Sequence, residues 1–447
     1  MVRVVVLNYQ GGEKVLRCLE HLASTDWPAD RLELVVVDNA STDGSAEAID
    51  RMAGVRLIRT THNMGFPANN LAMVDLDEVD YVALVNNDAY VTPGWLRPLV
   101  EVLEEDPGLG AACPKILFEP SFVDVGLSCE TFTAPGDPRR LGVRVSGVRV
   151  GGKDAWRSSQ FTRGFWGPER GVGEEEVFRW TEGSATLRVP APADGSEAVA
   201  RLRVATSRPD VLLEVSCGRS TTTHHVGPQP TWVEFPLEGE PYDVIQNAGS
   251  ILVEGGFGAD RGFLERDSEV YDEPADVFAW CGAAVLLSSR YLRSVGLFDE
   301  RFFMYYEDTD LAWRGRARGF RYRYVPTSLV RHAHAATSVE GSPLFIHFVE
   351  RNRLLMLTKN APESLVAKAW LSHLTATASY ARRDVLGPLL HLRRPSPELV
   401  VRRLRAFAAA LRLTPRMLRD RRKNRRAQIV RDAELMAWMV PQPRLSA

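Results

Sequence analysis

With 447 residues, of which 45% are hydrophobic and 25% charged, the chain is too long for one ordinary domain and too apolar to be disordered. Its five cysteines are scattered without paired spacing, which argues against a zinc motif or a disulfide framework and fits a reducing compartment. The formal net charge of −2 hides a basic C-terminal region, because residues 382–431 contain sixteen Arg or Lys and three Asp or Glu.

The first part of the chain, residues 1–119, predicts an α/β domain. Short β-branched runs alternate with helical patterns, which is typical of βαβ units in a sheet covered on both faces. We expect Ser41, Thr42 and Asp43 to cap the helix that follows them. The expected strands are 2–7, 32–37, 55–58, 81–85 and 110–115, and the first expected helix is 13–24.

Residues 120–242 have a different texture. Gly and Pro punctuate short alternating strands, and helical patterns are nearly absent, which favours an inserted β-sandwich. Four of its expected strands are 185–189, 200–205, 211–215 and 232–237. Five of its aromatic side chains either pack in its core or stack on sugar rings. They are Trp156, Phe165, Trp166, Trp180 and Trp232.

Residues 243–343 return to α/β patterns, and residues 344–447 are helical and basic. We expect a strand at 283–287, a helix at 308–318, and a strand at 322–325 that ends before Pro326. Prolines are expected to divide the C-terminal region into several helices. These prolines are Pro388, Pro395, Pro397 and Pro415.

Polar clusters follow the predicted strands, at the edge where open α/β sheets bind ligands. Asn8 and Tyr9 follow the first strand, and Asp38 and Asn39 follow the second. A carboxylate at this edge can accept a hydrogen bond from the imide N–H of uracil or thymine, a donor that adenine lacks. The alternative is that Asp38 and Asp43 only shape a turn and cap a helix.

Two further clusters suit a diphosphate and its cation. Residues 63–70 form a glycine-containing loop that enters a helix, whose free N–H groups can face a ligand. Asn86, Asn87 and Asp88 end a strand, and a single carboxylate suffices for a magnesium ion that takes its other ligands from phosphates and water. An ordinary strand-to-loop turn is the alternative for this triplet.

Taken in order, these motifs resemble the family-2 inverting glycosyltransferases of GT-A fold, in the bacterial branch with rhamnosyl- and galactofuranosyltransferases. The resemblance covers about 1–118 and 245–360. Asn86 departs from the family pattern, in which many members carry Asp at this position. The motifs of the second block are Cys281-Gly282-Ala283-Ala284, Gly296-Leu297-Phe298-Asp299-Glu300-Arg301-Phe302-Phe303, Glu307-Asp308-Thr309-Asp310-Leu311 and the His332 segment.

The resemblance implies an α/β GT-A fold, a Rossmann-like mixed sheet, and a cation, Mg²⁺ or Mn²⁺, held by Asp88 and His332. His334 is the other candidate histidine. The resemblance also implies that the nucleotide sugar is bound by Asn8, Tyr9, Asp38, Asn39, Asn63, Gly65, Phe66, Asn70 and Asn87, and the acceptor by Gly282, Ala283 and Asp310.

The catalytic base that the resemblance implies is Asp308, with Glu307 beside it. Chemistry supports this assignment, because single-displacement inversion needs a carboxylate to take the proton of the acceptor hydroxyl. Crowding among Glu307, Asp308 and Asp310 is expected to raise the pKa of the base. The alternative is that three carboxylates simply favour the N-terminus of a helix.

The basic C-terminal helices predict a contact with an anionic surface. No apolar run approaches the roughly 20 residues needed to span a bilayer, and the first residues are typical of a strand rather than of a secretory signal. We therefore expect a cytoplasmic protein, peripheral on the inner face of the plasma membrane. Segment 400–413 mixes arginine with Leu, Phe and Ala as an interfacial helix does, which favours an anionic membrane over nucleic acid. A solvated helical face is the alternative.

The sequence thus predicts a glycosyltransferase that uses a UDP- or dTDP-sugar of rhamnose or galactofuranose type and a cell-envelope glycan or lipid-linked acceptor. Two other classes stay open. A sugar nucleotidyltransferase would need a glycine-rich triphosphate loop with Lys and Arg, which the N-terminal region lacks. A non-catalytic glycan-binding protein would not need Asp38, Asp88 and Asp308 together.

Overall fold

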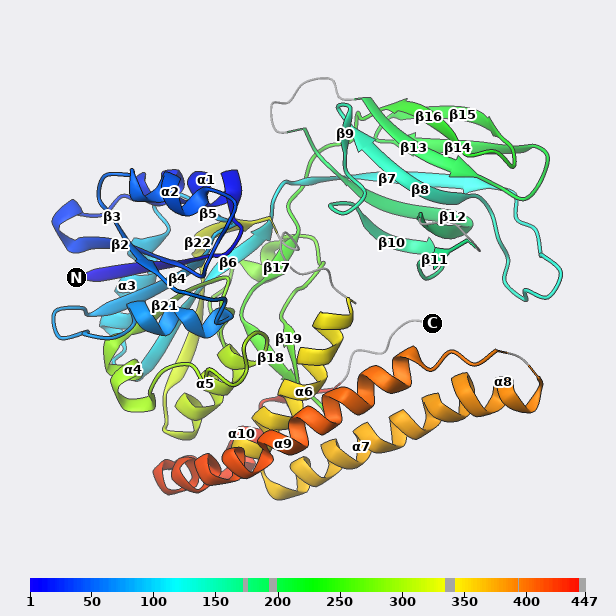
Figure 1. The fold of residues 1–447 in the computed structure, drawn as a ribbon. Coiled ribbons are helices and arrows are strands. Elements are labelled where there is room, and N and C mark those ends of the chain that lie inside the picture. Colours follow the sequence, from blue (N-terminus) through cyan, green and yellow to red (C-terminus); the bar gives the residue numbers. More distant parts are fainter. Residues whose placement is uncertain (172–175, 193–198, 334–341, 393, 442–447) are drawn as a thin grey trace. The chain divides into compact units, whose positions relative to one another are not determined.

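The computed structural model describes residues 1–171, 176–192, 199–333, 342–392 and 394–441. The chain divides into two compact units (Figure 1). Unit 1 comprises Met1–Leu117 and Ile245–Ala447, and unit 2 comprises Phe118–Val244. For comparison, the predicted insert was 120–242.

Unit 1 is built on a mixed sheet with the strand order β20-β22-β6-β21-β4-β1-β2-β3. Strands β4, β1, β2 and β3 are parallel, whereas β21 is antiparallel to β4 and to β6. Two short strands, β17 and β5, pair with β6 and β22. The bounds are β1 Val2–Asn8, β2 Leu32–Asp38, β3 Val55–Arg59, β4 Tyr81–Asn86, β5 Ala89–Val91, β6 Leu109–Phe118, β17 Ile245–Asn247, β20 Ala275–Asp276, β21 Ala284–Ser288 and β22 Arg321–His332.

Both faces of this sheet are covered, as the sequence predicted. Successive strand residues point to opposite faces, so Val4 and Val6 of β1 enter one apolar core and Val5 enters the other. The first core contains side chains of α1, α2 and α3, and the second those of α4, α5 and the 3₁₀ helix η2. The bounds are α1 Gly12–Ala23, α2 Ser45–Asp50, α3 Leu96–Glu105, α4 Ser289–Val295, α5 Glu307–Ala317, and the 3₁₀ helices η1 Ala29–Arg31, η2 Phe66–Ala72 and η3 Glu269–Tyr271.

Two local expectations need correction. The strand expected to end before Pro326 continues to His332, because β22 pairs with β20 at 323–324 and with β5 at 330–332, on either side of the proline. The loop at 63–65 enters a 3₁₀ helix of seven residues rather than an α-helix.

Unit 2 is all-β in its described residues, and its strands alternate buried and exposed side chains. Val211, Leu213 and Val215 are buried, whereas Leu212 and Glu214 between them are exposed. Strand β12 pairs with β7 in its second half and with β8 in its first, so it belongs to both halves of the sheet. The bounds are β7 Phe122–Cys129, β8 Arg144–Val150, β9 Lys153–Asp154, β10 Gln160–Phe165, β11 Glu169–Arg170, β12 Val177–Pro190, β13 Val199–Ala205, β14 Val211–Cys217, β15 Ser220–Val226 and β16 Thr231–Pro236.

The C-terminal part of unit 1 is helical, as expected, and it contributes to the second core through buried residues of α6, α7 and α9. Pro415 does not divide it, because this exposed proline lies inside α9, where water can bond the carbonyl that it frees. No helix in the described parts of the chain has the length and apolarity that a bilayer span requires. The bounds are α6 Pro343–Asn360, α7 Glu363–Ala381, a π-turn Arg382–Leu386, α8 Gly387–Leu390, α9 Glu398–Ala427, α10 Asp432–Met436, and a small sheet of β18 Ser250–Val253, β19 Phe257–Asp260 and β23 Met439–Val440.

Candidate active site

The carboxyl ends of β2, β1 and β4 meet at one edge of the unit 1 sheet. Asn8 pairs with Asp38 across β1 and β2, and Leu7 pairs with Asn86 across β1 and β4. Because β21 is antiparallel to β4, the residues that precede it reach the same edge. The backbone N–H of Asn86 donates to the carbonyl of Ala283 at 2.9 Å. The topology therefore brings polar clusters from both halves of unit 1 together.

Asp38 is held in a buried network. Its Oδ1 accepts from the amide of Asn8 at 2.8 Å, and its Oδ2 accepts from the backbone N–H of Ser41 at 3.2 Å. The Asn8 amide also donates to the Ser45 hydroxyl at 2.8 Å, and its Oδ1 has no hydrogen-bond partner among the described residues. Asp38 thus shapes the loop after β2. The nucleobase of a bound donor would hydrogen-bond to the remaining lone pairs of its carboxylate. Tyr9, next in the chain, is 37% exposed.

Asn39 joins the polar cluster after β2 to the loop 63–70. Its amide donates to Asn63 Oδ1 at 2.9 Å and to the Gly65 carbonyl at 3.1 Å, and its Oδ1 accepts from the backbone N–H of Met64 at 2.8 Å. Asn63 Oδ1 also accepts from the backbone N–H of Gly65 at 2.8 Å. These amides serve the loop itself, which explains why polar residues recur there.

The loop 63–70 packs against the segment 298–303. Gly65 has a φ of +73°, and a Cβ at this position would clash with the Phe303 carbonyl oxygen, which accepts from the backbone N–H of Phe66 at 2.7 Å. The Phe66 ring packs edge-on against Phe298 at 5.3 Å. Asn70 uses its amide on both the carbonyl and the N–H of Phe298, at 2.9 and 3.0 Å. Asn70 thus joins two segments of the chain, and its predicted contact with the nucleotide sugar stays a prediction.

Asp88 and His332 lie side by side. The Asp88 Oδ1 is 2.9 Å from His332 Nε2, and the other ring nitrogen, Nδ1, is 3.0 Å from Gln246 Oε1. Both side chains are buried. Burial, the largest single influence, acts to raise the pKa of Asp88, but the adjacent imidazole, Lys14 and a backbone hydrogen bond together lower that pKa below its ordinary value. His334 lies outside the described residues.

This pair fits a shared divalent cation. Two donors on neighbouring positions of an octahedral ion, each about 2.1 Å from it, stand about 3 Å apart, which matches the Asp88–His332 separation. Gln246 orients the imidazole in the way that outer-shell partners of metal-binding histidines do. Among the described residues no three His, Cys, Asp or Glu side chains converge on one point, so the other ligands would be phosphate oxygens and water.

The neighbours of Asp88 complete this edge. The Asn86 amide is 3.5 Å from His332 Nε2. A Cβ on Gly11 would clash with Asn8 Oδ1 and would lie 2.9 Å from the amide nitrogen of Asn87. The side chains of Asn8, after β1, and Asn87, after β4, therefore meet at this glycine. Gly11 and Gln246 escaped prediction, because neither follows a strand in a recognisable polar motif.

Asp308 lies at the start of α5 and contacts the edge through Gly282. Its Oδ2 accepts from the backbone N–H of Gly282 at 3.4 Å, and its Oδ1 accepts from the N–H and hydroxyl of Thr309 at 2.6 and 3.1 Å. Burial raises the pKa of Asp308, although these hydrogen bonds oppose the rise. A carboxyl with a raised pKa is a stronger base once ionised, as general-base catalysis requires.

Glu307, next to Asp308, is a buried carboxyl with an unused oxygen. It is 6% exposed, and its Oε2 has no hydrogen-bond partner among the described residues. Burial, with a contribution from Asp308, raises the pKa of Glu307 well above its ordinary value. The predicted crowding of carboxyls at this helix start is therefore present.

Asp310 has a different role from the one predicted. It has no solvent exposure, and it accepts from Arg314 at 2.9 Å, Lys359 at 2.9 Å and Asn360 at 2.7 Å. A carboxylate with three buried donors is part of the ion network that joins α5 to α6. The expectation that Asp310 contacts an acceptor does not fit this placement.

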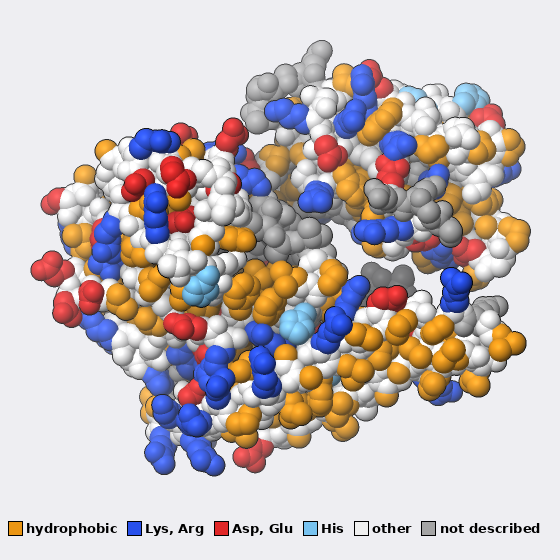
Figure 2. Space-filling view, viewed as in Figure 1, with side chains coloured by type: hydrophobic (Ala, Val, Ile, Leu, Met, Phe, Trp, Pro, Cys, Tyr) orange, Lys and Arg blue, Asp and Glu red, His pale blue; other side chains and the backbone are white. Residues whose placement is uncertain are grey.

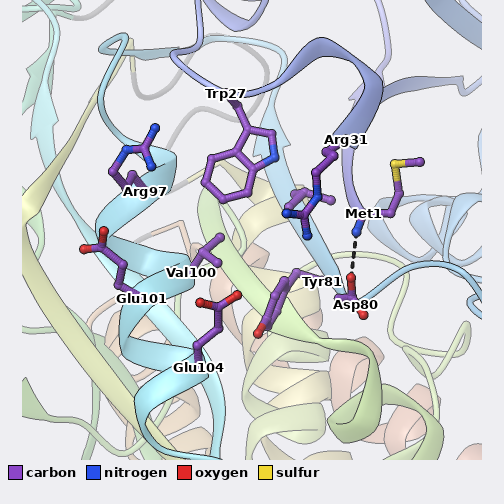
Figure 3. Close-up of a pocket in the computed structure, with 10 residues that line it drawn as sticks. Met1, Trp27, Arg31, Asp80, Tyr81, Arg97, Val100, Glu101 and Glu104 are labelled. Atoms are coloured by element: carbon purple, nitrogen blue, oxygen red, sulfur yellow. Dashed lines mark hydrogen bonds and ion pairs between the residues drawn. The ribbon is translucent and has the colours of Figure 1, made fainter.

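A cavity of about 230 Å³ lies at the opposite edge of the sheet (Figure 3). It is lined by Met1, Trp27 and Tyr81, among others, and the terminal amine of Met1 pairs with Asp80 at 2.6 Å. Because it adjoins the amino ends of β1 and β4, it is separate from the edge at which β2, β1 and β4 end.

Comparisons with known proteins give a partial match. Residues 3–124 match the family model described as glycosyl transferase family 2. The chain is 31% identical over 126 residues to N-acetylglucosaminyl-diphospho-decaprenol L-rhamnosyltransferase of Mycobacterium tuberculosis, a match that covers 25% of this chain and 40% of the relative. It is 28% identical over 109 residues to glycosyltransferase GlyG of Streptococcus pneumoniae, covering 24% and 36%. The chain therefore spans less than half the length of these curated relatives.

The chain also aligns with the solved structure of GalNAc-T7 with UDP, GalNAc and Mn²⁺, at a TM-score of 0.39 and 14% identity over 80% of this chain and 50% of that one. A mannosyltransferase from Pyrobaculum calidifontis in complex with GDP-Man and Mn²⁺ aligns at a TM-score of 0.36 and 15% identity, over 98% and 78%.

Proposed function

We propose that this chain, whose residues 3–124 belong to glycosyl transferase family 2, transfers a sugar from a nucleotide-sugar donor with inversion at the anomeric carbon. The donor class is a UDP- or dTDP-sugar of rhamnose or galactofuranose type, and the acceptor is a cell-envelope glycan or a lipid-linked glycan. The mycobacterial relative, by its name a rhamnosyltransferase acting on a decaprenol-linked sugar, supports both parts.

The observation that carries this proposal is the link between Asp308 and the strand edge. Asp308 accepts from the N–H of Gly282, and the next residue, Ala283, accepts from Asn86, two residues before Asp88. A candidate base and a candidate cation ligand from distant parts of the sequence are thus linked by one hydrogen bond from the backbone to the Asp308 side chain and one between backbone groups. Transfer between a diphosphate donor and an alcohol needs both groups at one site.

In this proposal the acceptor hydroxyl gives its proton to Asp308 as its oxygen attacks the anomeric carbon. The bond from that carbon to the diphosphate oxygen breaks on the opposite face, and the electron pair leaves with the nucleoside diphosphate. Gly282 and Thr309 hold the Asp308 carboxylate by hydrogen bonds. The base must be ionised to act, so its raised pKa predicts an acidic limb in the pH–rate profile above the ordinary value of 3.8.

The donor would lie along the edge formed by Tyr9, Asp38 and the Asn63–Phe66 loop. Asp88 and His332 would hold Mg²⁺ or Mn²⁺, which would offset the charge developing on the leaving diphosphate. Gln246 keeps the His332 ring in place. Ala283 and Gly282 adjoin Asp308 and form the start of the acceptor side.

A lipid-linked acceptor would require the enzyme to work at a membrane. The basic C-terminal helices support a peripheral position on an anionic surface, on the cytoplasmic face, without a contribution from nucleic acid.

The test is transfer activity of Asp308→Asn, with Asp26→Asn as the control because Asp26 is an exposed carboxylate elsewhere in unit 1. We expect Asp308→Asn to lose about 10²- to 10⁴-fold in turnover while the donor-induced thermal shift stays unchanged. Equal activity of the two variants would contradict the assignment. Release of pyrophosphate from a nucleoside triphosphate and a sugar phosphate would instead identify a nucleotidyltransferase, and glycan binding without donor turnover would identify a binding protein.

A further inference from the structure

The hairpin of α7, α8 and α9 exposes large apolar side chains in a part of unit 1 that the proposed reaction does not use. Figure 2 shows hydrophobic side chains gathered over α7 and α9, with Lys and Arg beside them. Soluble surfaces seldom keep so many leucines in water together unless they bind something. The exposed members are Leu371, Leu374, Leu386, Leu389, Leu390, Leu392, Val401, Leu404, Leu411 and Leu418.

On α9 these residues form a continuous stripe. The exposed apolar positions recur at intervals of three or four residues from Val401 to Leu418, which places them on one side of the helix. A row of exposed cationic residues runs next to the stripe, each of the first four one position after a stripe residue. The stripe is Val401, Leu404, Ala408, Leu411, Pro415 and Leu418, and the row is Arg405, Arg412, Arg416, Arg419 and Lys423.

The stripe of α9 and the exposed leucines of α7 lie on the same side of the hairpin. The two helices are antiparallel neighbours, because the rings of Trp370 and Phe407 are in contact at 5.3 Å and Arg403 donates to Thr377 at 3.0 Å. Leu374 in α7 and Leu411 in α9 each lie four residues beyond the contacting aromatic residue, which is a rotation of about 40°. In antiparallel helices equal rotations away from the contact lead to the same face.

We infer that this face binds the surface of an anionic lipid bilayer, with the leucines of α7, α8 and α9 below the headgroups and the arginine row at the level of the phosphates. An in-plane amphipathic element of this composition is typical of monotopic attachment. The tip is the most apolar part, with Leu390 at 83% and Leu392 at 98% exposure. The proposed contact therefore includes burial of leucine side chains in the bilayer, in addition to the attraction between arginines and anionic headgroups.

Charge decides between a bilayer and a second copy of the chain. Helix α9 contains eleven Arg or Lys and two acidic residues, Glu398 and Asp420. Asp420 already pairs with Arg301, whereas no ion pair joins the arginine row to a carboxylate of the described residues. Two copies packed face to face would bring two such rows together, which costs free energy, whereas anionic headgroups neutralise them.

The test is sedimentation of the full chain with vesicles of phosphatidylcholine alone or with 30% phosphatidylglycerol, without donor or acceptor, so that failure here leaves the proposed transfer reaction unaffected. The variants are Leu389→Glu with Leu390→Glu, and Arg412→Gln with Arg416→Gln. Leu212→Glu is the control, because Leu212 is 55% exposed in unit 2.

We expect the wild type and the control to bind the anionic vesicles, and to keep a measurable part of that binding in 0.5 M salt, where charge attraction is screened. The leucine variant should lose at least tenfold in partition coefficient, and the arginine variant severalfold on anionic vesicles only. Unchanged binding by the leucine variant, or complete release of the wild type by salt, would overturn insertion. A dimer in light scattering that the leucine variant dissociates, without vesicle binding, would show that a second copy covers the face.

Discussion

The side-chain amide of Asn352 donates to the backbone carbonyl of Tyr305 at 2.7 Å, two residues before Glu307. The same amide reaches the carbonyls of Phe302 and Met304, at 2.9 and 2.7 Å, and Asn352 has no solvent exposure. Together with Arg351, which donates to the carbonyls of Arg301 and Phe302, this side chain of α6 holds the segment that leads into the candidate base.

That segment needs external support because its backbone is strained. Phe303, Tyr305 and Tyr306 have φ values of 68°, 67° and 69°, a region that costs non-glycine residues roughly 1–3 kcal/mol each. Such a segment persists only where the surroundings fix it. Asn352 is thus a positioning residue for Glu307 and Asp308, although it touches neither.

We expect Asn352→Ala to lower turnover about 10- to 100-fold, because the segment that leads into α5 would shift. Asn424→Ala is the control for loss of an asparagine amide, since Asn424 of α9 donates one hydrogen bond, to Asn360, and none to the 302–305 segment. Steady-state kinetics measured below the unfolding temperature of both variants separates an effect on the position of the base from an effect on the stability of the fold. A parallel loss in both would mean that Asn352 only stabilises the fold.

Glu307→Gln should stabilise the protein increasingly as the pH rises. In the wild type the folded state retains the Glu307 proton to a higher pH than the unfolded state, whose pKa is near the ordinary 4.5. The stability that this proton contributes is complete below 4.5 and is lost as pH rises through the raised folded pKa. The difference in unfolding free energy should therefore grow by up to about 1.4 kcal/mol per pH unit above 4.5.

Denaturant titrations of both proteins across pH 4 to 8 measure this difference. A difference that stays constant over the range would mean that the folded and unfolded pKa values of Glu307 are equal. Asp26→Asn, at an exposed carboxylate, serves as the control and should show no such growth.

Much of the architecture followed from the sequence, and the family resemblance of the N-terminal part is confirmed by the match over residues 3–124. Strand periodicity gave the α/β class because strands such as Val2–Asn8 are buried on both faces. Local pattern failed where tertiary contacts decide. Nothing in the spacing of Glu307-Asp308-Thr309-Asp310 separates a half-buried Asp308 from an Asp310 enclosed by Arg314, Lys359 and Asn360, since those partners come largely from another helix.

The amides of Asn39, Asn63 and Asn70 illustrate a second limit. Their positions after strands predicted ligand contacts, but most of their hydrogen-bonding groups hold loops together. A polar loop motif reports that hydrogen bonds are needed, and only the fold shows whether a ligand or the backbone receives them. Asn352 was missed because it stands between Arg351 and Arg353, and the sequence does not show which polar residue of such a run is buried.

Removal of divalent cations should abolish transfer, and the loss should depend on Asp88 and His332. We expect His332→Ala to weaken the apparent affinity for Mn²⁺ about 10- to 100-fold and Asp88→Ala at least as much. His62→Ala is the control, because His62 is an exposed histidine of the same unit. Activity measured against Mn²⁺ concentration after chelation separates weaker metal binding, which excess metal restores, from loss of chemistry. An unchanged metal dependence in both variants would remove the pair from the cation site.

Gly65→Ala should uncouple the donor loop from the segment before the base. The substitution has two costs, a φ of +73° that a side chain disfavours and a clash with the Phe303 carbonyl, which also accepts the bond from Phe66. Gly54→Ala isolates the first cost, since Gly54 has a φ of +78° and open space around its Cβ. We expect Gly54→Ala to lose about 1 kcal/mol of stability with full activity.

Gly65→Ala should lose roughly 2–4 kcal/mol and, below its unfolding temperature, at least tenfold in kcat/KM for the donor, because Phe303 must move and it lies in the strained segment. Thermal unfolding of the two variants gives the loss of stability, and the transfer rate measured over a range of donor concentrations gives kcat/KM. If both alanine variants lost the same stability and neither lost kcat/KM for the donor, the contact between Gly65 and Phe303 would not contribute to the site.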